Sequence, residues 1–347
     1  SSQNLLVIIN DILDVSKIEA GKMSLESVEF NLDKMLEGVA DILSTKVLEK
    51  DLEFHFDIAP DVPAWMMGDT VRITQILTNL VSNAVKFTEQ GQVIISLRVL
   101  EKREDAINVE FSVQDTGIGL SQDHIAKLFK PFIQADSSTT RKFGGTGLGL
   151  TIVKQLVLLM GGQVRIESQL GKGSNFIFNL ILKPAPKMGY SQSPEPSLQD
   201  LQILVIDDSP FMRDILKAML KSLNFEATVA SLYSEGLHEL KKAVDDHRPY
   251  DLVIIDNKLP DATGAKVCAE IKNINPAKIT KTILISGFTE KDILKDIDTA
   301  EFDGFLHKPI TRSSLYNMIQ NVLGYEEAKE KIIGNAHEAE IENLDSI

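Results

Sequence analysis

Cysteine, long apolar runs and positive charge are all scarce in this sequence, and each scarcity excludes a class of protein. Cys268 is the only cysteine, so the chain can build neither an internal disulfide framework nor a cysteine-based metal site. The longest apolar candidate for a membrane span, Leu156–Met160, is far shorter than the roughly 20 residues required. With 36 Lys and Arg against 50 Asp and Glu, the net charge of −14 argues against a nucleic-acid partner. A polyanion can still bind where backbone N–H groups and one metal ion dominate locally.

Length and composition indicate an ordinary soluble protein with two domains. The 347 residues are 43% hydrophobic and 25% charged, which allows each of two domains to bury its own core. The sequence starts Ser1-Ser2-Gln3-Asn4, without an initiator Met or a signal peptide, so we interpret it as a fragment. We expect this piece to be cytoplasmic, while anchoring of the full-length protein in the inner membrane stays open.

Hydrophobic periodicity divides the first half of the chain into helices and strands. A wide apolar stripe predicts a helix from residue 1 to about 24, which needs a partner helix and has Gly21 as its stop. Further helices are expected at 31–50, from Asp69 to Phe87, at 121–128 and up to Met160, and strands at 53–58, 93–100, 107–114, 163–168 and 174–182.

The second half has a different rhythm. A Pro- and Ser-rich stretch at 184–200 is typical of a semi-rigid linker. Beyond it, short Val, Ile and Leu runs alternate with amphipathic helices, which predicts a parallel, doubly wound sheet. Its strands are expected at 203–206, 227–230, 252–255, 282–285 and 304–306. The tail, 325–347, holds seven acidic and two basic residues and is expected to be a solvated helix or disordered.

Three polar segments of the first half indicate a ligand site. Asn79, Asn83 and Lys86 are spaced i, i+4 and i+7, so they share one helix face, where packing would favour Leu. The segment Asp115–Gly119 ends a strand, and Gly144–Leu150 opens a helix whose glycines and free N–H groups suit phosphates. Taken singly, the asparagines of the helix could be surface amides, Asp115–Gly119 could be a turn and Gly144–Leu150 could be a flexible linker. The three in this order favour a nucleotide site, and neither a P-loop nor a dinucleotide-binding motif is present.

These segments together resemble the GHKL ATPase family, and within it the histidine-kinase branch, over residues 69–182. Asn79–Thr88 resembles the N box of that family, Asp115–Gly119 its G1 box and Gly144–Leu150 its G2 box. Phe129–Phe132 resembles the F box, which gyrase-like and chaperone-like relatives lack; its rings would be lid hinges or simply core. The resemblance implies a fold of the α/β class, a two-layer α/β sandwich.

The resemblance implies a role for each matched residue. Asn83, with Asn79, would hold Mg²⁺ on the triphosphate of ATP, and Lys86 would contact phosphate. Asp115 would accept a hydrogen bond from the adenine amino group. The other residues implied in nucleotide binding are Gly117, Gly119, Gly145, Thr146, Gly147, Leu148 and Gly149. Residues 133–146 would form a mobile lid, in which Arg141 and Lys142 reach the phosphates or merely face solvent.

The first helix adds to this resemblance. Ile9–Gly21 is similar to the second helix of the dimerisation and phosphotransfer hairpin, whose first helix carries the phosphoacceptor histidine in that family. We interpret every histidine of this chain as a surface or packing residue: His55, His124, His238, His247, His307 and His337. The chain is therefore expected to bind ATP but to lack its own autophosphorylation site.

A second set of polar residues follows the strands of the second half. Asp207 and Asp208 end its first strand and Asp256 its third, and these strand ends lie side by side in a doubly wound sheet. Clustered carboxylates repel one another unless a cation lies among them, and oxygen ligands suit Mg²⁺. Ser286 and Lys308, after the fourth and fifth strands, could bind a phosphoryl group. Each residue alone could be a helix cap or a surface residue.

This half resembles the receiver domain of two-component systems over residues 201–324. The resemblance implies that Asp256 is the nucleophile that becomes an aspartyl phosphate, and that Ser286 and Lys308 bind the phosphoryl oxygens. It implies a Mg²⁺ site made by Asp207, Asp208, Asp256 and the backbone carbonyl of Lys258. Phe305 takes the place of the switch aromatic. Mild departures at Asn257, Lys258 and Gly287 leave the lifetime of the acyl phosphate open.

The whole chain thus resembles part of a hybrid sensor histidine kinase. The expected order is a partial phosphotransfer helix at 1–24, an ATP-binding domain at 25–183, a linker at 184–200, a receiver at 201–324 and a tail. The implied function is a phosphorelay from ATP to a histidine on an upstream helix and then to Asp256. The implied partners are a second copy in the full-length protein and a downstream phosphotransfer or response-regulator protein. Two alternatives stay open: a GHKL ATPase without a kinase role, and an ATP-binding scaffold with a pseudo-receiver.

Overall fold

The computed structural model of the chain describes residues 9, 12–14, 16–18, 20–125, 128, 148–185, 200–274, 280–287 and 302–324. The chain divides into two compact units, Ser1–Tyr190 and Ser191–Ile347, which are described separately. The predicted lid at 133–146, the F box at Phe129–Phe132 and the tail at 325–347 lie outside the described residues.

Unit 1 is built on one mixed sheet with the strand order β1-β3-β7-β5-β4-β2, and β6 pairs with β7. Its strands are β1 (Val28–Asn31), β2 (Glu53–Ile58), β3 (Trp65–Gly68), β4 (Gln92–Lys102), β5 (Ile107–Asp115), β6 (Val164–Gln169) and β7 (Gly173–Pro184). The pair β2–β4 is parallel, and the other pairs are antiparallel.

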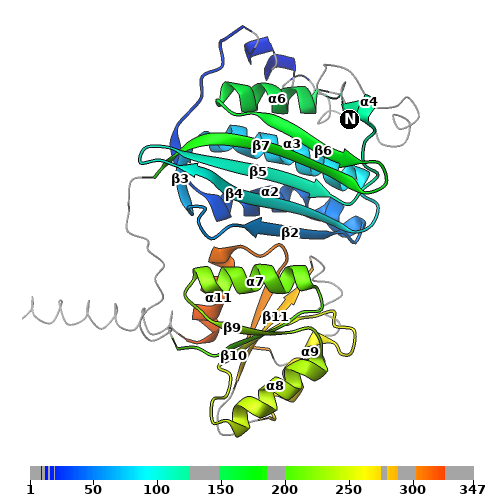
Figure 1. The fold of residues 1–347 in the computed structure, drawn as a ribbon, viewed down its shortest axis with the longest axis vertical. Helices are drawn as coiled ribbons and strands as arrows, with labels where there is room; N and C mark the ends of the chain where they lie inside the picture. The colour runs from blue at the N-terminus through cyan, green and yellow to red at the C-terminus, as the bar shows by residue number, and fades with distance from the viewer. Residues whose placement is uncertain are drawn as a thin grey trace, which may run out of the picture. The chain divides into compact units, whose positions relative to one another are not determined.

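Helices α2 (Leu32–Glu49), α3 (Thr70–Phe87) and α6 (Gly149–Leu159) cover one face of this sheet (Figure 1), and a short helix, α4, spans Gln122–Ile125. In β5 every second residue is buried, as expected of a strand with one face on a core. The rings of Phe111 and Phe178 stack there with centroids 4.9 Å apart. This is the predicted two-layer α/β sandwich, with two short strands, β1 and β3, that the sequence pattern did not reveal.

The described residues ahead of β1 include a helical stretch that ends where it was predicted to end. Residues 12–14 and 16–18 are helical, and Gly21 follows with a φ of 63°. The Gly21 N–H donates to Ile18 O at 2.9 Å and the Lys22 N–H to Lys17 O at 2.9 Å. A glycine in the left-handed region with such paired bonds is a common helix terminator.

Unit 2 is a parallel sheet, as predicted, and its strand order is β12-β11-β10-β8-β9. Its strands are β8 (Ile203–Ile206), β9 (Ala227–Ala230), β10 (Leu252–Asp256), β11 (Lys281–Ser286) and β12 (Gly304–His307). Its described helices are α7 (Pro210–Ser222), α8 (Tyr233–Asp245), α9 (Gly264–Ile271) and α11 (Arg312–Val322). Helices α7 and α11 pack on one face and α8 and α9 on the other, so the sheet is buried on both sides (Figure 1).

Membrane-spanning helices were searched for among the described residues. None of the helices there combines the length and the apolar character that crossing a bilayer demands.

Candidate functional site

Helix α3 carries the first set of predicted residues on a polar face. Asp69 caps the helix by accepting a hydrogen bond of 3.0 Å from the Arg72 N–H. The opposite face is fully buried, with Ile73, Ile76, Leu77, Leu80 and Val81 among its core residues. Asn79, Asn83 and Lys86 are half-buried on the polar side. The helix thus anchors on the core and presents two amides and an ammonium along one stripe.

The start of α6 approaches this stripe closely. A Cβ added at Gly149 would lie 3.0 Å from Asn79 Oδ1, so the absence of a side chain allows α6 to approach α3 there. Leu148 precedes the helix, is buried and supplies no side-chain cap. The first N–H groups of α6 therefore receive no hydrogen bond from the Leu148 side chain. Gly145, Thr146 and Gly147 lie outside the described residues.

The loop Asp115–Gly119 packs against the end of the same α3. Asp115 is 5% exposed, and its Oδ1 accepts hydrogen bonds from the N–H groups of Gly117 at 2.8 Å and Ser174 at 3.3 Å. Burial raises the pKa of Asp115, and these two bonds partly oppose the rise. A Cβ at Gly117 would lie 2.4 Å from Phe87 O, so glycine is required for this contact.

The far side of this loop is held by the turn between β6 and β7. Gly119 has a φ of 65°, and a Cβ there would lie 2.0 Å from Gln169 O. The Gly171 N–H donates to Ile118 O at 2.7 Å, and the Leu120 N–H donates to Ser168 Oγ at 2.8 Å. The loop is therefore fixed on both sides by backbone contacts.

Lys86 lies at the end of the polar stripe. Its Nζ is 4.9 Å from the centroid of the Phe87 ring. Burial lowers the pKa of Lys86, and the nearby Lys46 ammonium lowers it further. The structure thus gathers Asn79, Asn83, Lys86 and Gly149 around α3, with the Asp115 loop at its C-terminal end.

Sequence reasoning missed a polar contact at the other end of this stripe. Asp14 Oδ2 accepts hydrogen bonds from Arg72 Nη1 at 3.2 Å and Gln75 Nε2 at 2.9 Å. Arg72 and Gln75 are seven and four residues before Asn79, so they share its face of α3. One stripe of α3 therefore contacts the helical stretch before Gly21 and then continues into the candidate ligand site. Arg72 and Gln75 belong to no recognisable motif, so nothing in the sequence marked them as part of this stripe.

The second set of predicted residues meets at the carboxyl ends of β8 and β10. Lys308 Nζ donates to Asp256 Oδ1 at 2.6 Å and lies 3.7 Å from Asp207 Oδ2. Asp256 Oδ2 accepts a hydrogen bond of 2.9 Å from the Lys258 N–H. Both oxygens of Asp256 are thus oriented by hydrogen bonds from neighbouring donors. Ser286, at the end of β11, is 7% exposed.

Asp207 is the most deeply buried acid of this cluster, at 1% exposure. Burial raises its pKa to about 6; the Lys308 ammonium lowers it and the Asp256 carboxylate raises it further. Its Oδ1 accepts a hydrogen bond from the Ser209 N–H at 2.9 Å, whereas the buried Oδ2 has no hydrogen-bond partner. An orphaned carboxylate oxygen in such a place fits a cation ligand.

Asp208 differs from Asp207 in that its side chain is exposed. Within the part of the chain that the structure describes, no three His, Cys, Asp or Glu side chains converge on a common metal position. The described cluster is instead organised around the Lys308 ammonium.

Arg213, which sequence reasoning missed, donates from Nη1 to the carbonyl oxygens of Asp207 at 2.6 Å and Asp208 at 3.0 Å. These bonds fix the backbone of the acidic pair.

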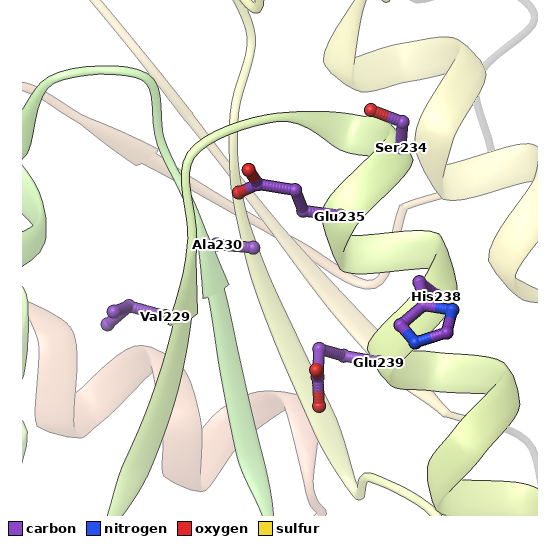
Figure 2. A pocket seen from close by; sticks show the side chains of 6 residues that line it. All are labelled: Val229, Ala230, Ser234, Glu235, His238 and Glu239. Carbon is purple, nitrogen blue, oxygen red and sulfur yellow. The ribbon is translucent and has the colours of Figure 1, made fainter.

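The predicted switch aromatic is a half-buried residue of β12. The Phe305 ring lies 4.5 Å from the exposed His307 ring, in an edge-on arrangement. A separate pocket of about 410 Å³ lies between β9 and α8, where Val229, Ala230, Ser234, Glu235, His238 and Glu239 line it (Figure 2). It contains none of the predicted site residues.

Comparison with known families agrees with this geometry. Residues 68–184 match the family described as histidine kinase-, DNA gyrase B-, and HSP90-like ATPase. Residues 203–320 match the response regulator receiver domain. The chain joins a histidine kinase-like ATPase domain to a receiver domain. This domain content is that of a hybrid sensor histidine kinase.

Curated proteins with this pairing are similar along most of the chain. The sensor histidine kinase GacS of Pseudomonas protegens is 40% identical over 251 residues, which are 71% of this ATPase–receiver chain and 27% of GacS. The autoinducer 2 sensor kinase/phosphatase LuxQ of Vibrio vulnificus is 33% identical over 327 residues, 88% of the chain and 38% of LuxQ. The chain therefore spans well under half the length of these relatives.

A solved structure shares the fold of both domains. The crystal structure of full-length ShkA in complex with AMPPNP matches the ATPase–receiver chain with a TM-score of 0.67 and 26% identity. The match covers 92% of this chain and 62% of ShkA.

Proposed function

We propose that this chain belongs to a protein histidine kinase that passes a phosphoryl group from ATP to a histidine and then to its own Asp256. The observation that carries the proposal is the bond of 2.6 Å between Lys308 Nζ and Asp256 Oδ1, with Asp207 alongside, in a chain that also holds a GHKL-type nucleotide site. A carboxylate that accepts a hydrogen bond from an ammonium is suited to attack a phosphoryl group whose charge the ammonium offsets.

In the ATPase domain, we assign adenine recognition to Asp115 and phosphate contacts to the α3 stripe. The two N–H groups that bond Asp115 Oδ1 orient the carboxylate towards one ligand position, and an acceptor there suits an exocyclic amino group. Asn79 and Asn83 offer carbonyl oxygens, and Lys86 offers a positive charge. Gly117, Gly119 and Gly149 keep side chains out of the backbone approach. Catalysis in this domain consists mainly of positioning and charge neutralisation.

We assign Mg²⁺ to both sites, because the residues present are oxygen donors of the kind that this ion prefers. In the receiver, the ion would be held by Asp207, Asp256, the backbone carbonyl of Lys258 and the exposed carboxylate of Asp208. In the ATPase domain, the ion would be held by Asn83. The buried Oδ2 of Asp207, which has no hydrogen-bond partner and only the Lys308 ammonium at 3.7 Å, supports the receiver assignment. The bound ion would supply positive charge beside the transferring phosphoryl group.

The proposed transfer to Asp256 exchanges one phosphorus bond for another. A phosphohistidine P–N bond breaks, a P–O bond forms to a carboxylate oxygen of Asp256, and the released imidazole takes up a proton. Lys308 and Ser286 then contact the phosphoryl oxygens. The negative charge added to Asp256 would shift the receiver between two conformations, and Phe305 would be the aromatic residue that changes position with them.

The partners follow from this scheme. We propose a phosphoacceptor histidine on a helix upstream of Ile9, a second copy of the chain in the full-length protein, and a downstream phosphotransfer or response-regulator protein. The full-length protein works in the cytoplasm, alone or on a membrane anchor.

The test uses the chain extended upstream by the proposed helix, with Asp256 kept or changed to Ala, and Mg-ATP labelled on its γ-phosphate. We expect acid-labile label on the Asp256→Ala variant and base-labile label on Asp256 in the parent. ATP binding without any protein label would leave a GHKL ATPase or a binding module. Failure of Asp256 to take phosphate from phosphoramidate would leave a scaffold with a pseudo-receiver.

A further inference from the structure

Helix α3 ends without a glycine cap. Thr88, at its C-cap, has an extended backbone, and the first glycine beyond it is Gly91, so no glycine cap closes the helix. The last carbonyl groups of a helix have no partner within it, and leaving one buried and unbonded is costly. The end of α3 therefore needs donors from elsewhere in the fold.

Most of these donors belong to one side chain, Lys50, which directly follows α2. Lys50 Nζ donates three hydrogen bonds of 2.9 Å, to the carbonyl oxygens of Val85, Lys86 and Thr88. An ammonium has three donors and no acceptor, so all of its hydrogen-bonding capacity is used here. Its positive charge also offsets the negative end of the helix dipole.

The remaining carbonyl groups are satisfied by neighbours. Ala84 O accepts from the Thr88 N–H at 3.0 Å and from Thr88 Oγ1 at 2.7 Å. Phe87 O accepts from the Ile118 N–H at 3.3 Å. The carbonyl groups from Ala84 to Thr88 are thus all bonded: Lys50 bonds three of them, Thr88 bonds that of Ala84, and the Asp115–Gly119 loop bonds that of Phe87.

The chain that leaves α3 makes a second junction with the same loop. A Cβ at Gly91 would lie 2.2 Å from Thr116 Oγ1, so glycine permits close contact. The Gln92 N–H donates to Thr116 Oγ1 at 3.0 Å, and the Thr116 N–H donates to Gln92 O at 3.2 Å. Lys50 therefore holds a segment that contacts the loop at both Thr116 and Ile118.

We propose that Lys50 is a positioning residue of the nucleotide site, which holds the end of α3 so that Lys86 and the Asp115–Gly119 loop keep their places. The proposal rests on the proposed function, in which that loop and Lys86 contact ATP. Lys50 itself touches backbone and acts on the nucleotide only through these two elements.

The test compares Lys50→Met with Lys34→Met, which removes an exposed ammonium from helix α2, the helix that Lys50 follows. Amide hydrogen exchange is followed at Thr116 and Ile118, with Phe111 in β5 as the internal reference for global stability. The dissociation constant of a non-hydrolysable ATP analogue with Mg²⁺ is measured under conditions where each variant is folded. Lys50→Arg, which keeps the charge and several donors, serves as the conservative variant.

We expect Lys50→Met to speed exchange at Thr116 and Ile118 by about tenfold beyond any change at Phe111, and to weaken analogue binding about tenfold, because local opening is no longer opposed. Lys34→Met should change neither quantity, and Lys50→Arg should recover part of both. If Lys50→Met does not fold, Lys50→Gln, which retains one donor group, carries the same comparison.

Unchanged analogue affinity in a folded Lys50→Met, or faster exchange at Phe111 to the same degree as at Ile118, would reduce Lys50 to a structural cap and overturn the proposal. A parent chain that binds no analogue would overturn the proposed function and this role with it. The exchange measurements would then still report whether Lys50 holds the loop, so the two failures can be told apart.

Discussion

The two candidate sites of this chain are built by opposite means. In the ATPase domain, glycines at Gly117, Gly119 and Gly149 let backbone segments come together, and neutral amides line the approach. In the receiver, Lys308 Nζ lies 2.6 Å from Asp256 Oδ1 and 3.7 Å from Asp207 Oδ2. The first site is specified by shape and the second by charge. Adding a methyl group should therefore damage the first, whereas removing a charge should release strain in the second.

The largest expected effect is on the shape of the ATPase site. Gly119→Ala should destabilise unit 1 by about 3 kcal/mol or more, because the residue has a positive φ and its new Cβ meets Gln169 O at 2.0 Å. Urea unfolding measures the loss. The matched control is Gly38→Ala in α2, where a Cβ meets nothing, and which should stabilise by about 1 kcal/mol. A loss no larger than that gain would mean that shape is not what specifies this loop.

The next effect has the opposite sign and belongs to the receiver. Asp207→Asn should stabilise unit 2 at neutral pH without divalent ions by about 1–2 kcal/mol, because it removes a buried charge but keeps the acceptor for the Ser209 N–H. The same variant should lose most labelling of Asp256 by phosphoramidate. Chemical unfolding and label incorporation are measured together. A less stable variant would show that the Lys308 ammonium already more than offsets the burial of this carboxylate.

Helix caps extend the comparison beyond the sites. In unit 1, α2 and α3 are capped by Asn31 and Asp69, three residues before the N–H groups they bind. In unit 2, Ser209 and Thr311 cap α7 and α11 in the same way. Helix α8 differs, because it begins after Leu232, which cannot cap, and Asp261 accepts from the Tyr233 and Ser234 N–H groups at 3.0 Å each. Asp261 lies on the loop that follows Asp256, so this loop and α8 are joined.

Removing this distant cap should have a moderate effect. Asp261→Ala should lower the free energy of unfolding of unit 2 by about 1 kcal/mol, as is typical when a helix cap is lost. Asp245→Ala, which changes an exposed acid at the other end of α8, is the control and should be close to neutral. Equal effects of the two substitutions on thermal unfolding would mean that the contact from Asp261 is incidental.

The smallest effect is a pH dependence in unit 2. Burial alone would raise the pKa of Asp303, but hydrogen bonds from Lys281 Nζ and the Thr282 N–H outweigh it and lower that pKa. A carboxyl whose pKa is lower in the folded state stabilises above its unfolded pKa, and this contribution fades as the pH falls through the folded value. Asp303→Asn should therefore cost stability at neutral pH, and the difference from the parent should shrink in acid. A difference that stays constant across urea unfolding at several pH values would contradict this origin.

Much of the fold followed from the sequence because its signals are local. The alternation in 107–114 and the buried runs of the second half predicted strands that the structure contains, and Gly21 predicted a helix end. The strands β1 and β3 escaped because each has only four residues and lies outside any regular alternation of strands and helices, such as the one that marked the equally short β8, β9 and β12. They form by pairing, β1 with β3 and β3 also with β7. Short strands of this kind carry too few residues for a period to show.

The sites followed in part for the same reason. The proximity of Asp207, Asp256 and Lys308 could be predicted because parallel strands end at one edge of a sheet. The exposure of Asp208 could not be predicted, because the side chains of neighbouring loop residues point in different directions. Lys50 and Asp14 were invisible because each acts through contacts between segments far apart in the sequence. Arg213 bonds to the backbone of Asp207 and Asp208 only six and five residues earlier, but no local sequence pattern marks that contact.

Helix α3 has one further consequence, for chemistry directed at this domain. One side of the helix is committed to the core. On the other side, Arg72 and Gln75 contact Asp14, and Asn79, Asn83 and Lys86 belong to the proposed nucleotide site. Few positions of the helix are therefore free to change without loss of folding or binding. If an inhibitor competed with ATP by contacting this stripe, few substitutions there could weaken its binding without also impairing folding or ATP binding.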